Sequence, residues 1–280
     1  MTRKLILAGI LVLLTAMAAS AQQGEGPLDP APPKGITVDQ IVHQFAAKEK
    51  EFKQARENYT YTQDVTVMTP EDQGTYREVF DVTFDDRGRR IENVKFAPAN
   101  TLQRIQITKE DLDDIRNRLP FVLTSDEVGQ YTINYLGQQD QDELHCYVFD
   151  ISPRTIEKNQ RYFDGRIWVD DTDFQIVKTY GKTVPDRIKT KQDENLFPRF
   201  TTYREQIDGR YWFPTYTRAE DTLAFSTGDV RIREIVKYTN YKRFGSKVKI
   251  TYEGQELPTT DQQKKQSGGQ QPPPPQQPPK

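Results

Sequence analysis

The chain has 280 residues, of which 35% are hydrophobic and 29% charged, which is enough for one substantial core or two small ones. Its formal net charge is -2, from 39 basic and 41 acidic residues, so no basic excess exists to bind a nucleic-acid backbone. The single Cys146 excludes an intrachain disulfide, which a fold of this size does not need.

The N-terminal residues have the pattern of a secretory signal. Arg3 and Lys4 supply positive charge, residues 5–14 are apolar, and residues 19–21 fit the small-x-small cleavage pattern. We therefore expect cleavage after Ala21 and export to the periplasm. An uncleaved membrane anchor is the alternative, but it calls for a longer apolar run.

A linker and an amphipathic helix are predicted next. Residues 22–36 contain Gly, Pro and Gln with little to bury, which is typical of a linker. Thr37 and Gln40 form a capping box, and a helix follows to about residue 56. Its apolar stripe packs either as ordinary core or as a movable lid. The stripe consists of Val38, Ile41, Val42, Phe45 and Phe52.

From Tyr59 the apolar period changes to two, which predicts half-buried antiparallel strands at about 59–67, 76–84 and 89–97. The apolar residues at alternate positions are Tyr59, Tyr61, Val65 and Val67 in the first strand, and Tyr76, Phe80, Val82 and Phe84 in the second. A second helix is expected from Thr108 to Pro120, because Pro ends a helix. Its stripe is Leu112, Ile115 and Leu119.

The strand pattern resumes in the second half of the chain. Tyr131, Ile133 and Tyr135 share one parity, as do Tyr147, Phe149 and Ile151, and a hairpin follows at 161–180. Residues 181–198 lack either period and are interpreted as a long loop. Further strands are predicted at 200–207, 211–218 and 230–244. The Pro/Gln-rich residues 253–280 cannot bury enough surface to fold and are predicted to be disordered.

These elements predict a mainly β fold. About ten strands in hairpin order build a curved antiparallel meander, and a twisted meander of that length curls or closes. Two helices are available to cover its concave face. The expected domain therefore spans residues 37–252.

Few residues suit catalysis. His145 and Cys146 are neighbours, and neighbours on a strand point to opposite faces, so they cannot act together on one substrate. Asp170, Asp171 and Asp173 lie in a hairpin turn and lack the glycine and glutamate of a calcium-binding EF-hand loop. We expect no metal, no cofactor and no enzyme activity, although a paired-carboxylate hydrolase is left open.

The aromatic content is the positive signal, with 14 Tyr, 14 Phe and 2 Trp. Most aromatic residues fill cores and strands. An open curved sheet also leaves apolar surface that a soluble monomer rarely exposes. Either the helices seal that surface, or a ligand with acyl chains occupies it.

Three stretches of the chain are similar to a known family. They are YFDGRIWVDDTDFQIVKTYGK, FPRFTTYREQIDGRYWFPTYTRAEDTL and DVRIREIVKYTNYKRFG. They resemble the LolA/LolB-like superfamily, and within it the exported outer membrane lipoprotein-sorting proteins, over about residues 37–250. The resemblance implies an unclosed β-barrel whose helices cover a hydrophobic cavity for acyl chains. The chain lacks an acylated Cys, as a soluble carrier does, and no Arg matches the lid-latching Arg motif of the family.

The resemblance and the strand parity together predict a monomeric periplasmic carrier or binder of lipoprotein acyl chains or lipids. It would sort them towards the outer membrane, with transient membrane-protein partners. The expected cavity residues are Tyr61, Phe80, Phe84, Tyr135, Phe149, Ile167 and Phe174. The expected lid residues are Phe45, Phe52, Leu112 and Ile115. The alternative is a sensor or scaffold that binds a protein partner through the same fold and the Pro-rich tail.

Overall fold

The computed structural model describes residues 25–85, 87–118, 123–190 and 194–244. The predicted signal at 1–21 and the predicted tail at 253–280 lie outside these ranges. Within them, no helix is both long and apolar enough to cross a membrane.

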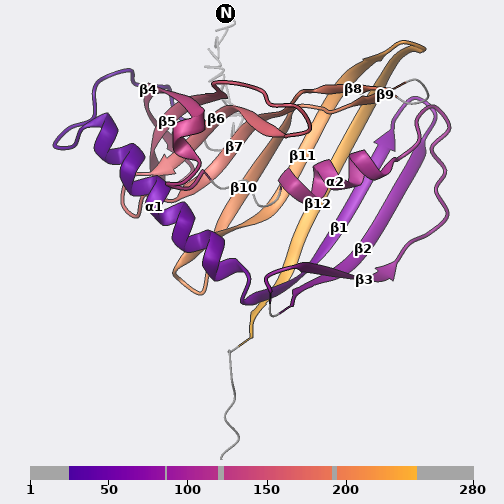
Figure 1. Ribbon diagram of the computed structural model, residues 1–280, viewed down its shortest axis with the longest axis horizontal. Helices are drawn as coiled ribbons and strands as arrows, with labels where there is room; N and C mark the ends of the chain where they lie inside the picture. The colour runs from indigo at the N-terminus through magenta and orange to yellow at the C-terminus, as the bar shows by residue number, and fades with distance from the viewer. Residues whose placement is uncertain (1–24, 86, 119–122, 191–193, 245–280) are drawn as a thin grey trace, which may run out of the picture. The chain divides into compact units, whose positions relative to one another are not determined.

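Ten antiparallel strands form one sheet that does not close, as the alternating patterns predicted (Figure 1). Their order is β3-β2-β1-β12-β11-β10-β7-β6-β5-β4, which makes β3 and β4 the two edges. The strands are β1 Tyr59–Thr69, β2 Gly74–Phe84, β3 Arg90–Phe96, β4 Tyr131–Gln141, β5 Leu144–Pro153, β6 Tyr162–Asp170, β7 Ile176–Val184, β10 Phe200–Ile207, β11 Tyr211–Phe225 and β12 Gly228–Arg243.

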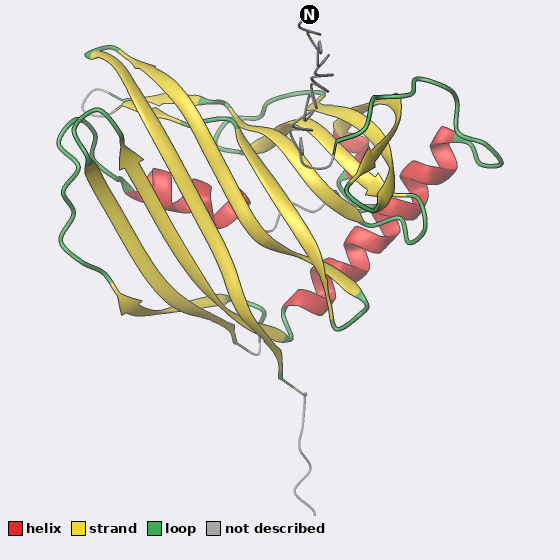
Figure 2. Ribbon diagram, turned by 180° about the vertical axis from the view of Figure 1, so that it is seen from behind, coloured by secondary structure: helices red, strands yellow, loops and turns green. Residues whose placement is uncertain are grey.

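Both α-helices lie on the same face of the sheet (Figures 1 and 2). α1 (Val38–Arg56) begins at the predicted capping box, where the Gln40 N–H donates to Thr37 Oγ1 at 3.2 Å and the Thr37 N–H donates to Gln40 Oε1 at 2.9 Å. α2 (Lys109–Arg118) begins after Thr108, whose N–H donates to Asp111 Oδ2 at 2.8 Å. A single 3-10 turn, η1 (Val128–Gln130), precedes β4.

α1 packs as core on one half of this face. Its side chains Ile41, Phe45 and Ala46 are at most 1% exposed and contact apolar side chains of β5, β6 and β7. A buried ion pair adds to this packing, because Arg204 Nη1 of β10 donates to Glu49 Oε1 at 2.9 Å. This packing favours ordinary core over a movable lid for α1.

α2 covers the other half. Ile115 is 3% exposed and packs on side chains from β1, β2 and β12. The strict alternation of buried and half-buried residues along β1 places the predicted apolar parity on this face. The two largest apolar clusters of the described residues therefore lie on this face, one under each helix.

The prediction of a long loop at 181–198 is wrong in part. β7 continues to Val184, and β8 (Arg187–Lys189) pairs with β9 (Glu194–Leu196) in a separate two-stranded sheet. Three-residue strands are too short to display a period, so the pattern could not reveal them. β11 also extends beyond the predicted end at Arg218, to Phe225.

The described part of the predicted linker, residues 25–36, also differs from expectation. Glu25 bridges to Gln141 and Asp29 to Gln138, so this segment covers the β4 edge. The close approach requires glycine at position 137, where φ is +145° and a Cβ would lie 2.1 Å from the Asp29 carbonyl oxygen.

Candidate functional site

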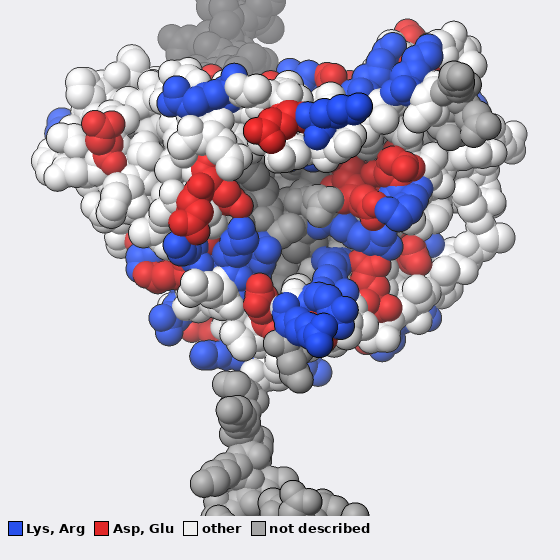
Figure 3. Space-filling view, viewed as in Figure 1, with Lys and Arg blue, Asp and Glu red and all other residues white. Residues whose placement is uncertain are grey.

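A cavity of about 280 Å³ lies between the C-terminal end of α1, α2 and the sheet. It is lined by Phe52, Arg56, Tyr61, Phe84, Gly88, Arg90, Asp113, Arg116, Phe213, Pro214 and Tyr241. Figure 3 shows this face of the molecule, with basic and acidic side chains around the depression between the two helices. We call this cavity the aromatic pocket.

Five aromatic rings form most of its wall. Phe52 of α1 lies 5.0 Å from Phe213 of β11, and Phe213 lies 4.8 Å from Tyr241 of β12, between ring centroids. Tyr241 in turn lies 5.2 Å from Tyr61 of β1. Rings at these separations attract one another and leave a continuous apolar surface. Such a surface is suited to hydrocarbon.

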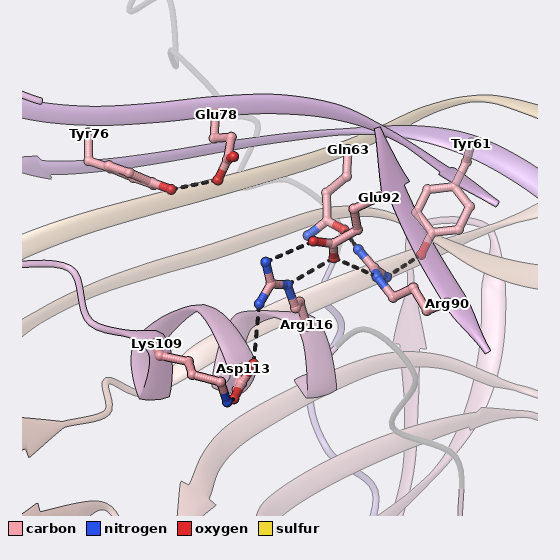
Figure 4. Close-up of polar contacts among 9 residues, drawn as sticks. All are labelled: Tyr61, Gln63, Tyr76, Glu78, Arg90, Glu92, Lys109, Asp113 and Arg116. Atoms are coloured by element: carbon pink, nitrogen blue, oxygen red, sulfur yellow. Dashed lines mark hydrogen bonds and ion pairs between the residues drawn. The ribbon is translucent and has the colours of Figure 1, made fainter. Parts of the chain in front are cut away.

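A polar network closes the opposite side of the pocket (Figure 4). Glu92 of β3 accepts hydrogen bonds from two guanidinium groups, at 2.7 Å from Arg90 Nε and at 2.9 Å from Arg116 Nε. Arg90 also donates to the Tyr61 hydroxyl at 2.7 Å and to Gln63 Oε1 at 2.6 Å. Two cations thus share one carboxylate beside an apolar wall.

The network joins α2 to the sheet. Arg116 Nη1 donates to Asp113 Oδ1 at 3.2 Å, and Asp113 also accepts from Lys109. The Lys109 hydrogen bond, with Arg116 nearby, holds the pKa of Asp113 below its ordinary value. Burial raises the pKa of Tyr61 and lowers that of Arg56, because both charged forms lose water contact there.

Five of the eleven predicted site residues are brought together here. Tyr61, Phe84 and Phe52 line the aromatic pocket itself. Phe80 and Ile115 lie in the adjoining apolar cluster under α2, and the Arg90 guanidinium carbon is 5.7 Å from the Phe80 ring centroid.

The other six lie elsewhere. Phe45, Phe149 and Ile167 are 0% exposed in the core under α1, where the Phe45 and Phe149 rings are 5.7 Å apart. Tyr135 and Phe174 pack at the margin of that core, and Leu112 is half-buried on α2. Apart from Leu112, these residues lie in or around a filled core, because α1 occupies the space that a single wide cavity would need.

The sequence interpretation missed the polar residues of the site. Arg90, Glu92 and Arg116 lie in segments where charged residues are ordinary. Gln63 did offer a signal, since it interrupts the apolar parity of β1 between Tyr61 and Val65. A polar side chain that is 0% exposed on a strand's apolar face marks a buried polar contact.

Two other cavities have more polar walls. One, of about 480 Å³, lies between the segment that precedes α2 and β9, and it is bordered by Arg104, Lys189, Asp111 and Glu194. Another, of about 690 Å³, is bordered by Asp150, Arg166, Lys178 and Arg218. The aromatic pocket is the smallest of the three, and its wall suits an apolar ligand best.

The Cys146 thiol is inaccessible. Its side chain is buried among Val148, Trp168 and Val177, whereas the neighbouring His145 is exposed, so the two side chains do point to opposite faces of the strand. Burial raises the Cys146 pKa to about 12, so almost no thiolate exists at neutral pH. We expect a maleimide reagent to leave the native protein unlabelled and to label it fully in denaturant. Rapid labelling of the folded protein would contradict this placement.

The acidic hairpin turn is explained by its hydrogen bonds. Asp170 Oδ2 accepts from the backbone N–H of Thr172 at 3.2 Å and of Asp173 at 2.9 Å. Asp173 Oδ2 accepts from Trp212 Nε1 at 2.7 Å. Over the described part of the chain, no group of three or more His, Cys, Asp or Glu is arranged to hold a metal ion.

Comparisons with known proteins give fold-level likenesses. No protein-family model matches the chain. No curated protein matches it. A DUF1329 family protein from Desulfovibrio piger is similar, with a TM-score of 0.39 and 14% identity over 72% of this chain and 91% of that one. A domain assigned to an outer membrane lipoprotein-sorting protein of Vibrio parahaemolyticus has a TM-score of 0.35 and 12% identity over 74% and 95%.

MucB is also similar, with a TM-score of 0.24 and 10% identity over 71% of this chain and 92% of that one. MucB has in addition been solved in complex with MucA(peri). At these identities the function of this chain has to be argued from its own side chains.

Proposed function

We propose that this protein is an exported binder and carrier of acyl chains that holds its ligand in the aromatic pocket without covalent chemistry. The observation that carries the proposal is the pocket wall, in which five aromatic rings from α1 and four strands surround a cavity of about 280 Å³. Small-molecule sites are concave and mostly apolar, with a few placed polar groups, and occupy about 300–1,000 Å³.

The energetics suit reversible binding. Each buried CH₂ group contributes about 0.8 kcal/mol, so a chain that enters the pocket with several of them gains useful affinity. No covalent bond is required, and release needs only a path to a competing apolar environment. Exchange with a membrane or a partner protein supplies such an environment.

α2 is the element suited to open that path. Of its described side chains only Asp114 and Ile115 are buried, and two ion pairs tie it to the sheet, Arg116–Glu92 at β3 and Asp114–Arg161 beside β6. α1 is different, because it buries an apolar stripe and the Glu49–Arg204 pair. Elements with few buried apolar contacts open at low free-energy cost. In this proposal α1 is the fixed wall and α2 the cover.

Native mass spectrometry is the direct test. The protein is exported to the periplasm of a bacterial host, purified without detergent and sprayed from a volatile buffer. We expect added mass that matches a lipid or an acylated peptide and that is lost on denaturation. A clean apo mass that is unchanged after incubation with fatty acid would overturn the proposal.

A protein-partner role is the second candidate, and the β3 edge favours it. Three of the exposed large apolar residues are on this edge strand: Ile91 is 43% exposed, Val94 60% and Phe96 50%. An exposed apolar edge is a template for an added strand. The same mass spectra discriminate between the candidates, since a bound polypeptide and a bound lipid differ in mass and in fragmentation.

A further inference from the structure

We infer that α2 turns about β8 and β9 as a hinge, so that the aromatic pocket opens and takes up its ligand between α2 and β3. The inference rests on the proposed function, to which it adds the ligand's entrance and the fixed side of the cover. It is carried by the contacts on the two sides of α2, which differ in burial. We call β8, β9 and Phe197, which directly follows β9, the β8–β9 arm.

The β8–β9 arm is attached to β11, an interior strand of the large sheet. Arg187 Nη2 of β8 donates to the Ala224 carbonyl oxygen of β11 at 2.7 Å. The backbone N–H of Ser226, directly after β11, donates to Glu194 Oε2 of β9 at 2.7 Å. Arg187 and Glu194 also form an ion pair, in which Nη1 and Oε1 are 3.2 Å apart. The arm therefore has a support of its own on the sheet.

Asn195 of the arm is hydrogen-bonded to the first turn of α2. Its Nδ2 donates to Thr108 Oγ1 at 2.6 Å and to Asp111 Oδ1 at 3.2 Å. The same two residues cap the helix, since the Asp111 N–H donates to Thr108 Oγ1 at 3.3 Å. Asn195 is 4% exposed, so these hydrogen bonds are sheltered from water. Breaking them is costly, because buried polar groups then lose their partners.

A second buried contact joins the arm to α2 through Arg161. Its guanidinium carbon lies 3.8 Å from the Phe197 ring centroid, and its Nη2 donates to Asp114 Oδ1 at 2.9 Å. Phe197 and Asp114 are each 4% exposed. Asp111 and Asp114 are three positions apart, so they lie on one side of α2. The arm therefore holds that side along about one turn of the helix.

The other side of α2 faces the aromatic pocket, where Asp113 and Arg116 line the wall. Its printed contact with β3 is the ion pair between Arg116 and Glu92 (Figure 4). These two side chains are 31% and 19% exposed, against 1% for Asp114, so water screens their attraction and replaces it more readily. Of the described contacts, the one at Arg116 beside the pocket is therefore the first to release.

The buried apolar side chain of α2 lies towards the hinge. Ile115 borders the cavity of about 480 Å³ next to the arm, together with Thr108 and Asp111. A side chain near the axis of a rotation moves little, so Ile115 keeps most of its burial when the pocket side of α2 moves. The rotation separates Arg116 from β3 and gives a hydrocarbon chain access to the pocket wall.

Cross-links on the two sides of α2 test the hinge. One double variant, Asn195→Cys with Asp111→Cys, replaces a pair that is in contact on the arm side, and Arg116→Cys with Glu92→Cys does so on the pocket side. A short bis-maleimide with a reducible spacer joins each pair, while the buried Cys146 stays unmodified. Stopped-flow fluorescence then gives the loading and release rates of the fluorescent fatty acid cis-parinarate before linking, after linking and after reduction of the spacer.

We expect the cross-link between positions 116 and 92 to slow loading and release by about tenfold or more, because it closes the entrance. Reduction of the spacer should restore both rates. The cross-link between positions 195 and 111 should change either rate by less than about twofold, because the hinge contacts persist in the open and closed states. Each comparison is made within one protein, so the effect of the cysteine substitutions themselves cancels.

The outcomes separate the inference from the proposed function. Equal slowing by both cross-links would mean that α2 leaves the sheet as a unit, which overturns the hinge. Slowing by the arm-side cross-link alone, or by neither, places the entrance elsewhere and also overturns it. Failure of the wild-type protein to bind cis-parinarate would overturn the proposed function as well. Thr108→Cys replaces Asp111→Cys where the first arm-side variant does not fold, since Asn195 contacts both residues.

Discussion

Replacing Glu49 with leucine is expected to lower the free energy of unfolding by about 3–5 kcal/mol, because the Arg204 guanidinium stays buried but loses the Glu49 carboxylate. The two side chains are 0% and 2% exposed, and two hydrogen bonds join them. Removing one member of a buried pair leaves the other with the cost of desolvation and without its main compensation. Urea unfolding followed by circular dichroism measures the loss.

Two controls define the cause. The double variant Glu49→Leu with Arg204→Met should recover most of the lost stability, since an apolar pair of similar volume often replaces a buried ion pair without loss. Glu51→Leu removes the exposed partner of Lys48 on the same helix and should change stability by less than about 1 kcal/mol. A loss in Glu49→Leu no larger than that of Glu51→Leu would contradict the assigned role.

The Glu49–Arg204 ion pair also affects the proposed binding site. If Glu49 and Arg204 fix α1 to β10, the wall of the aromatic pocket that Phe52 provides is rigid, and opening must occur at α2. The two helices were equivalent in the sequence, since both carry an apolar stripe. Their difference lies in how much apolar surface each helix buries, since α1 buries four apolar side chains and the described part of α2 buries Ile115.

Local features of the fold could be predicted because neighbouring residues determine them. The capping box at Thr37, the start of α2 after Thr108 and the alternation along β1 follow from hydrogen bonds and side-chain directions within a few positions. The mainly β class followed from counting such segments. The open sheet with two helices on one face agrees with that expectation.

The location of the pocket could not be predicted, because it depends on contacts between distant segments. Pairing of β1 with β12 places Tyr61 of the first beside Tyr241 of the second, and β11 adds Phe213 next to them. The alternation along the strands placed both Tyr61 and Phe149 on the apolar face of the sheet. Only the position of α1 decides that Phe149 is sealed in core while Tyr61 lines a cavity.

Replacing Phe84 with aspartate is expected to weaken binding of an acyl-chain ligand by about thirtyfold or more. Loss of the ring's apolar contact costs about 2 kcal/mol, which equals about thirtyfold in affinity. The new carboxylate adds to this, because it lies in an apolar wall and competes for Arg90. Phe84 is half-buried at the end of β2, so the sheet should stay folded, which circular dichroism and thermal unfolding would verify.

Matched variants separate the pocket from the surrounding sheet. Phe84→Leu keeps an apolar wall and should lose less than about tenfold in affinity. Val94→Asp introduces the same charge on β3 at a residue that is 60% exposed and outside the pocket, and it should bind like the wild type. Unchanged affinity in Phe84→Asp would place the ligand elsewhere on the protein.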